Sequence, residues 1–238
     1  MPPSDLAASL AAVRQRTDEA ARRAGRDPAD VRLVAVTKGV PGPRVREAYA
    51  AGVRDVGENR VEEGVPKRDG LADLADLRWH MIGRVQSRKA RRVAEAFDIV
   101  HSVDRVKLAR HLDRASGEAG RVLPVLLECN LSGEEAKAGW RLEGGSIEAS
   151  VLGEWEEIGR LPNLRLVGLM TLAPWGAPAP VLRRAFGGLR WALEAAASRI
   201  PGTWRELSMG MTDDFETAIE EGATMVRIGR AIFEPAAT

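Results

Sequence analysis

Short β-rich runs alternate with helical segments along nearly the whole chain, and this alternation restricts the fold more than any other feature. Eight strands with seven intervening helices is the count of a (β/α)8 TIM-type barrel. The 238 residues suit one such domain, because these barrels typically have about 250 residues. The expected strands are 33–37, 55–57, 79–82, 99–102, 125–130, 166–169, 206–208 and 225–228. The expected helices are 43–51, 60–69, 87–95, 105–117, 150–160, 180–199 and 213–221.

The alternation leaves a second architecture open, since a doubly wound open sheet has the same pattern. No linker or internal repeat divides the sequence, so we expect a single domain spanning residues 1–238. Leu6, Leu10 and Val13 have helical spacing and predict an extra N-terminal helix over 4–24. The stretches 132–146 and 172–180 are expected to be loops.

Composition and charge predict where the protein resides and which classes of partner it binds. Hydrophobic residues make up 45% and charged residues 29% of the chain, as in soluble globular proteins. The 35 basic and 34 acidic residues nearly cancel, so nucleic acid is not an expected partner. No apolar run approaches the roughly 20 residues that span a bilayer, and no signal peptide or zinc spacing is present. We expect a cytoplasmic protein without a metal or a membrane partner.

Lys38 ends the first expected strand, and Gly39 and Pro41 follow it in a turn. In a barrel the carboxyl ends of the strands share one face, which normally carries the active site. A lysine anchored there can attack a carbonyl. The alternative is an ordinary solvent-facing loop lysine.

The ends of the seventh and eighth strands have the composition of a phosphate site. The residues concerned are Ser208, Met209, Gly210, Thr212 and Gly229. Such barrels commonly bind phosphate with these two loops and a helix N-terminus. Glycine admits close backbone approach, and free N–H groups favour an anion. Helix capping by Ser208 and Thr212 is the alternative, and Asp213 already offsets the helix dipole.

A phosphate site beside a strand-end lysine favours pyridoxal phosphate, held as a Schiff base. Arg227, at the end of the last strand, could then face the pyridine nitrogen, or it could form a buried ion pair. His80 is a candidate to stack near the cofactor ring. The alternative is that it is a hydrogen-bonded histidine of the core. Asn59 could bind a ring hydroxyl or cap the next helix. Met170 is expected to line the pocket as an apolar contact.

Several stretches resemble the pyridoxal phosphate homeostasis protein family, whose fold is similar to the barrel domain of alanine racemase, the fold-type III class of pyridoxal phosphate proteins. The matching segments are LVAVTK (33–38), DVGENRVEE (55–63), WHMIGRVQSRK (79–89), HSVDRVKLA (101–109), NLSGEEAKAGW (130–140), GLMTLAP (168–174) and LSMGMTDDFETAIEEGATMVRIGRAIF (207–233). They cover nearly the whole chain. The final block is the most specific.

The resemblance implies a cofactor role for each matching site residue. Lys38 would form the Schiff base, Ser208, Thr212 and Gly229 would lie at the phosphate, and Arg227 would face the ring nitrogen. Asn59, Ser102 and Met170 would line the pocket. The chain departs from the family pattern at Gly39, Val40, Thr212, Arg230 and Glu234.

The sequence favours a carrier over an enzyme. Alanine racemase uses a lysine and a tyrosine from a second domain, whereas this chain has one tyrosine, Tyr49, in the helix after the first strand. We therefore expect a protein, compatible with a monomer, that buffers pyridoxal phosphate or delivers it to apoenzymes. A racemase or lyase acting on small amino acids is the alternative. Lys137 is a weaker candidate aldehyde-reactive lysine, and a helical face carrying Arg84, Arg88 and Arg92 is a weaker candidate RNA site.

Overall fold

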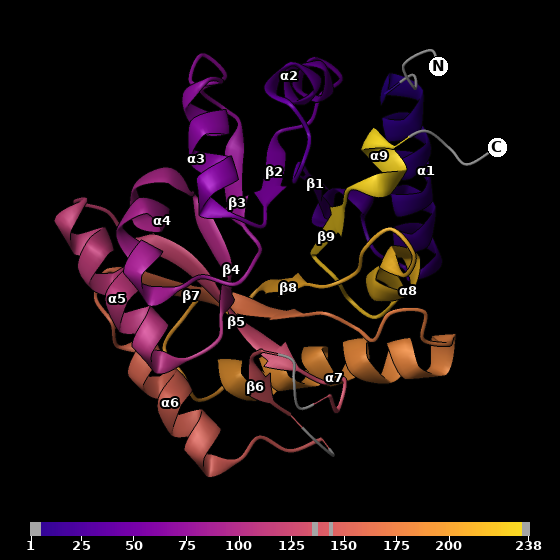
Figure 1. Cartoon of the computed structure of the whole chain (residues 1–238). Coiled ribbons are helices and arrows are strands. Elements are labelled where there is room, and N and C mark those ends of the chain that lie inside the picture. Colours follow the sequence, from indigo (N-terminus) through magenta and orange to yellow (C-terminus); the bar gives the residue numbers. More distant parts are fainter. Residues whose placement is uncertain (1–5, 135–137, 143–144, 235–238) are drawn as a thin grey trace.

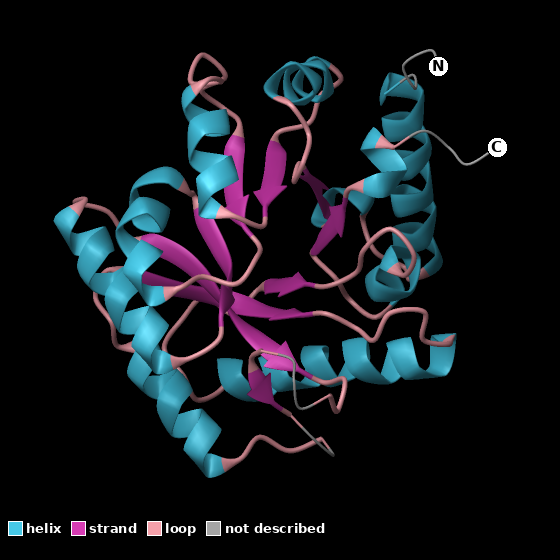
Figure 2. Cartoon of the chain, in the orientation of Figure 1, coloured by secondary structure: helices cyan, strands magenta, loops and turns pink. Residues whose placement is uncertain are grey.

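The computed structural model describes residues 6–134, 138–142 and 145–234. The strands found in these residues form one parallel sheet in the order β4-β3-β2-β1-β9-β8-β7-β5-β6, and β4 also pairs with β5. That last pairing closes eight strands into a barrel and excludes the open sheet. The helices surround the strands (Figures 1 and 2). The strands are β1 Arg32–Val36, β2 Asp55–Glu58, β3 Arg78–Met81, β4 Ile99–Val103, β5 Leu123–Asn130, β6 Trp140–Arg141, β7 Leu164–Thr171, β8 Glu206–Ser208 and β9 Met225–Ile228.

Helices follow the strands along the chain, as the sequence predicts. They are α1 Leu6–Arg23, α2 Gly42–Ala50, α3 Val61–Asp69, α4 Ala90–Ala96, α5 Val106–Glu118, α6 Ala149–Gly159, α7 Ala179–Ala197, α8 Phe215–Glu220 and α9 Arg230–Phe233, with 3-10 turns η1 Pro28–Asp30 and η2 Ser87–Lys89. The extra N-terminal helix α1 packs beside α8 and α9 (Figure 1). Ion pairs from Arg16 to Glu216 and from Arg23 to Glu220 fasten it there.

The structure differs from the sequence-based expectation in three short segments. The expected loop 132–146 contains β6, which pairs with the end of β5. Helix α9 follows the last strand, and the expected helix 87–95 divides into η2 and α4. Two-residue strands and single-turn helices are too short to show hydrophobic periodicity. Long-range packing instead positions Trp140 of β6, whose ring centroid lies 6.1 Å from that of Trp155.

The barrel interior combines an apolar layer with polar side chains. A cluster separate from the main core fills part of the interior, and its members are Val34, Ile99, Leu126, Val167, Met170 and Met225. Buried polar side chains accompany it, and they include Asp55, His80, His101, Ser208 and Arg227. The interior is therefore packed, as is usual for this fold. Among the residues described, no helix has the length and apolar content needed to cross a bilayer.

Candidate functional site

A cavity of about 390 Å³ opens at the carboxyl ends of β1 and β9, between the loops that follow β7 and β8. Its walls include Lys38, Thr212, Arg227 and Gly229. The structure therefore brings Lys38, after the first strand, together with three candidates from the ends of the last two barrel strands. The loop after β7 adds Trp175, whose side chain is largely exposed. This end of the barrel is where (β/α)8 proteins normally place their active sites.

Lys38 follows β1 in a tight turn and is exposed at the cavity wall. Gly39 adopts a φ of +69°, a left-handed conformation that glycine tolerates best. Its N–H donates a hydrogen bond to Glu63 Oε1. The turn therefore fixes the backbone of Lys38 while the side chain stays accessible.

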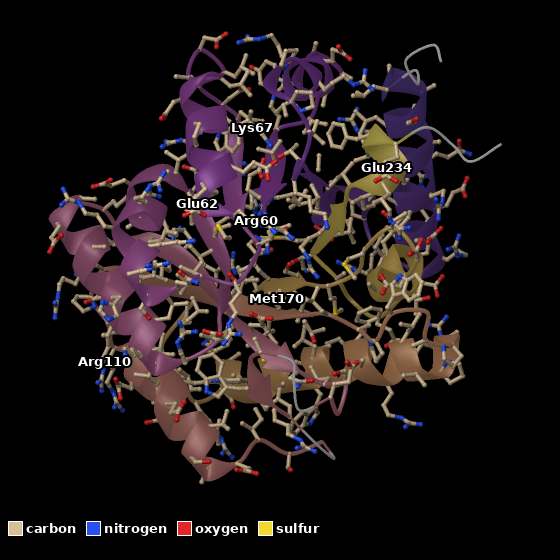
Figure 3. All side chains as sticks on the ribbon, in the orientation of Figure 1. Arg60, Glu62, Lys67, Arg110, Met170 and Glu234 are labelled. Atoms are coloured by element: carbon tan, nitrogen blue, oxygen red, sulfur yellow. The ribbon has the colours of Figure 1, made fainter. Side chains whose placement is uncertain are left out.

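Lys67 of α3, labelled in Figure 3, hydrogen-bonds to the backbone next to this turn. Its Nζ donates to the Thr37 carbonyl oxygen at 2.6 Å, to Glu58 Oε1 at 2.6 Å and to Glu63 Oε1 at 3.1 Å. Thr37 Oγ1 also donates to Glu58 Oε1 at 2.6 Å. Burial raises the pKa of Glu58, although the hydrogen bonds from Lys67 and Thr37 oppose that shift. The sequence-based predictions did not include this cluster. The available signal was the spacing of Glu63 and Lys67, because residues four apart on a helix can form an ion pair.

Arg227 brings a buried positive charge to the base of the cavity. Its Nη1 donates to Ser208 Oγ at 2.6 Å and its Nη2 to the Thr171 carbonyl oxygen at 2.9 Å. Burial lowers the pKa of Arg227 to about 10, against the opposing charges of Asp214 and Glu128. The guanidinium therefore stays cationic at neutral pH and is held in a fixed orientation.

Ser208 does not line the cavity, which differs from the phosphate position that the resemblance implies. Its hydroxyl is fully buried, accepts from Arg227 and lies 2.7 Å from His101 Nδ1. These contacts show that Ser208, the last residue of β8, points into the barrel. Among the predicted phosphate residues, Thr212 and Gly229 are the two at the cavity wall.

The loops after β8 and β9 leave backbone donors available for an anion. Within the described part of the chain, neither the N–H of Thr212 nor that of Gly229 donates to a protein acceptor. A Cβ added at Gly229 would lie 3.2 Å from the Val36 carbonyl oxygen, so a larger residue would crowd the cavity wall. The N-cap of α8 is Asp214, whose Oδ1 accepts from the Met211 N–H at 2.5 Å. Thr212 is therefore not the cap, and these groups fit a phosphate.

The comparisons with known proteins agree with this geometry. The family model for the N-terminal domain of alanine racemase matches residues 8–236. A protein of Pseudomonas aeruginosa named pyridoxal phosphate homeostasis protein is 46% identical over 97% of this chain and 95% of its own length. The chain belongs to the pyridoxal phosphate homeostasis protein family.

Solved structures extend the comparison to three dimensions. PipY of Synechococcus elongatus, described with PLP bound, is 39% identical to this homeostasis-family chain, with a TM-score of 0.83. The match covers 96% of this chain and 100% of PipY. Alanine racemase of Streptomyces coelicolor shares the fold, with a TM-score of 0.71 at 20% identity over 95% of this chain and 58% of that one.

The other candidate residues lie outside the cavity of this homeostasis-family chain. Both ring nitrogens of His80 are engaged inside the barrel, by Asp55 and His101. Ser102 Oγ donates to the Gly83 carbonyl oxygen at 2.6 Å. Met170 belongs to the apolar interior cluster (Figure 3). The cofactor contacts expected of these residues stay predictions.

Three further candidates shape the backbone near the site. Asn59 packs so closely on Gly83 that an added Cβ there would lie 2.2 Å from the Asn59 carbonyl oxygen. The N-cap of α3 is Arg60, so Asn59 does not cap that helix. Met209 is buried, and its N–H donates a hydrogen bond to the Met225 carbonyl oxygen at 3.1 Å. Gly210 has a φ of +93° in the turn that leads from β8 toward α8.

Three of the five departures from the family pattern line the cavity, and Thr212 is one of them. Arg230 and Glu234 both line the cavity, and Glu234 is labelled in Figure 3. Arg230 forms an ion pair with Asp213. The Asp213 carboxylate therefore offsets the positive charge added by Arg230. Lys137 lies outside the described residues.

The proposed basic helical face does not exist as such. Arg84 lies in the loop after β3, Arg88 in η2 and Arg92 in α4. Acidic partners also accompany this segment: Arg84 lies 3.5 Å from Asp104, and Lys89 lies 2.9 Å from Glu62. The expectation of one helical stripe was wrong because the helix begins only at Ala90.

Proposed function

We propose that this chain binds pyridoxal phosphate in the cavity at the carboxyl end of its barrel, attached covalently to Lys38, and buffers or delivers the cofactor. One observation carries the proposal. A strand-end amine, a buried guanidinium and two free backbone N–H groups converge on a single cavity. Membership of the homeostasis family, and the solved PipY structure with PLP bound, support the same ligand.

Each group in the cavity has a distinct task. When bound, pyridoxal phosphate supplies an aldehyde that condenses with an amine and a phosphate that needs hydrogen-bond donors. Lys38 provides the amine at the cavity wall. The N–H groups of Thr212 and Gly229 provide donors for the anion, as in other barrels of this type. Arg227 is cationic and would keep a facing pyridine nitrogen unprotonated, which weakens electron withdrawal by the ring.

The position of Tyr49 supports a carrier over a two-base racemase. Its hydroxyl donates to Asp76, and the Arg54 guanidinium lies 4.2 Å from its ring centre. Tyr49 is near the end of α2, which leads back to the start of β2, so it lies toward the amino-terminal end of the barrel. Lys38 lies at the opposite end. The chain's one tyrosine is therefore not placed to act as a second base.

Replacing Lys38 tests the proposed attachment. We expect Lys38→Ala to abolish the visible absorption band of lysine-bound pyridoxal phosphate and to speed cofactor loss on dialysis. Lys107→Ala, an exposed substitution on α5, is the matched control and should leave the band unchanged. A band of full intensity in Lys38→Ala would refute the attachment. Steady turnover of amino acids that requires Lys38 would favour the enzyme alternative.

A further inference from the structure

Five buried polar side chains form a continuous line of hydrogen bonds through the barrel interior. Asp55 Oδ1 lies 2.8 Å from His80 Nε2, and His80 Nδ1 lies 2.8 Å from His101 Nε2. His101 Nδ1 then lies 2.7 Å from Ser208 Oγ, which accepts from Arg227 Nη1 at 2.6 Å. The line joins β2, β3, β4, β8 and β9. It runs from the first residue of β2 to the wall of the cavity.

The direction of every bond follows from the donors available. A guanidinium can only donate and an ionised carboxylate can only accept, so with both imidazoles neutral the Ser208 hydroxyl accepts from Arg227 and donates its own hydrogen to His101 Nδ1. His101 then carries its proton on Nε2 and donates it to His80 Nδ1. His80 in turn carries its proton on Nε2 and donates it to the Asp55 carboxylate. All the hydrogens therefore point from Arg227 toward Asp55.

Burial, together with nearby positive charges, keeps both imidazoles neutral. Burial lowers the pKa of His80, although the Asp55 carboxylate opposes that shift. Burial, together with neighbouring His80 and Arg227, holds the pKa of His101 well below its usual range. Arg32 of β1 lowers the pKa of both imidazoles.

The far end of the line is a stable anion. Burial opposes ionisation of Asp55, but the hydrogen bond from His80 and the charges of Arg78 and Arg32 lower the pKa of this carboxyl overall. Arg78 Nη2 lies 2.7 Å from Asp55 Oδ2 and Arg32 Nε lies 3.8 Å from Oδ1. The line therefore connects a fixed cation at the cavity to a fixed anion at the start of β2.

We propose that Asp55, His80, His101 and Ser208 are positioning residues that hold the Arg227 guanidinium toward the cavity through a one-way hydrogen-bond line, with both imidazoles protonated on Nε2. The inference rests on the proposed function only where Arg227 meets the cofactor. Ser208 fixes one nitrogen of the guanidinium and the Thr171 carbonyl fixes the other. Without the line, the guanidinium would retain the second contact alone and could rotate away from the cavity.

Histidine nitrogen-15 spectra of the cofactor-free protein test the line directly. The chain has three histidines, and exposed His111 on α5 is an internal reference. We expect His80 and His101 to show the neutral Nε2–H form with no titration between about pH 5 and pH 8. Ser208→Ala should change the His101 nitrogen signals, and Ser208→Thr, which keeps the hydroxyl, should restore them. A titrating His101, or an Nδ1–H form, would overturn the proposed direction.

Cofactor retention tests whether the line acts through Arg227. We expect Ser208→Ala to speed pyridoxal phosphate loss by about tenfold, and Ser208→Thr to reverse much of that loss. In an Arg227→Gln background, Ser208→Ala should have no further effect, because the positioned group is gone. Additive effects of the two substitutions would contradict a positioning role. Failure of the protein to bind pyridoxal phosphate at all would refute the proposed function. The nitrogen-15 spectra of the cofactor-free protein would still test the hydrogen-bond line.

Discussion

Glu128 shows how burial and a neighbouring charge raise the pKa of a single residue in this barrel. Its carboxyl is buried on β5, and desolvation together with Asp104 raises its pKa to about 7, against the pull of Arg227 and Arg84. The ordinary value is 4.5, so the unfolded chain ionises this group at lower pH than the folded protein does. Ionisation of Glu128 should therefore cost folding stability as the pH rises from about 4.5 to 7, and the loss should persist above that range.

We predict that Glu128→Gln stabilises the cofactor-free protein at about pH 8 by roughly 1–3 kcal/mol and has little effect near pH 4.5. The neutral amide avoids the desolvation of a carboxylate at high pH and resembles the protonated acid at low pH. Urea unfolding at the two pH values measures the difference. Glu118→Gln, on the exposed side of α5, controls for a change of surface charge. An equal effect at both pH values would contradict the buried ionisation.

At the scale of elements, the end of β2 and helix α3 together hold the turn that carries Lys38. Glu58 is fully buried and the side chain of Lys67 is 8% exposed, so their ion pair at 2.6 Å has little contact with water. Glu58 Oε2 is buried and has no hydrogen-bond partner among the described residues. Removing Lys67 would therefore leave a buried carboxylate without its cation.

We predict that Lys67→Met destabilises the protein by about 3 kcal/mol, in line with breaking other buried ion pairs. Adding Glu58→Gln to Lys67→Met should recover part of this loss, since the stranded charge is then removed. Urea unfolding of the two variants at neutral pH provides the comparison. If the double variant is no more stable than Lys67→Met, the ion pair is not the source of the loss.

The turn between β8 and α8 depends on a glycine in a crowded place. Gly210 has a φ of +93°, and an added Cβ would lie 2.6 Å from the Ala218 Cβ. Gly25 also has a positive φ, +68°, but has nothing within 4 Å of an added Cβ. Comparing the two separates steric overlap from backbone conformation.

We predict that Gly25→Ala costs about 1 kcal/mol, the price of the left-handed conformation alone, and that Gly210→Ala costs a further 1–3 kcal/mol or so from overlap with α8. Thermal or urea unfolding gives both values. Gly210→Ala should also weaken cofactor retention, because Thr212 follows in the same loop. Equal losses for the two variants would argue against the close packing of α8 on this turn.

The elements that sequence predicts well are those with enough residues to show a pattern. The buried runs of β1, β5 and β7 and the long amphipathic helices were predicted near their observed places. Strand β6 and helix α9 were missed, because two and four residues carry no periodicity. Long-range pairing, not local preference, determines β6.

The candidate site likewise contains residues that the sequence predicts and contacts that it does not. Lys38, Thr212, Arg227 and Gly229 could be predicted because each occupies a strand end or the loop after it, where barrels place their chemistry. The hydrogen bonds of Ser208 with His101 and Arg227 could not be predicted. Whether a strand residue faces the interior next to His101 depends on the register and closure of all eight strands, which single-sequence patterns do not reveal.

At the scale of the whole molecule, the cavity lies at one end of a closed barrel and has a largely exposed rim. Lys38 and Arg230 are exposed, and Trp175 is 85% exposed at the same mouth. An accessible attachment site suits a protein that gives its ligand away more than one that protects a reaction from water. The exposed rim therefore supports the proposal that the chain passes pyridoxal phosphate to an apoenzyme.

The most direct measurement is chemical mapping of the attachment point. The full chain is loaded with pyridoxal phosphate and reduced with borohydride, and the modified peptides are identified by mass spectrometry. Attachment at the cavity predicts that Lys38 carries the label and that Lys67, buried in its ion pairs, does not. A label on Lys137 or on any other lysine, with Lys38 left unmodified, would contradict the account.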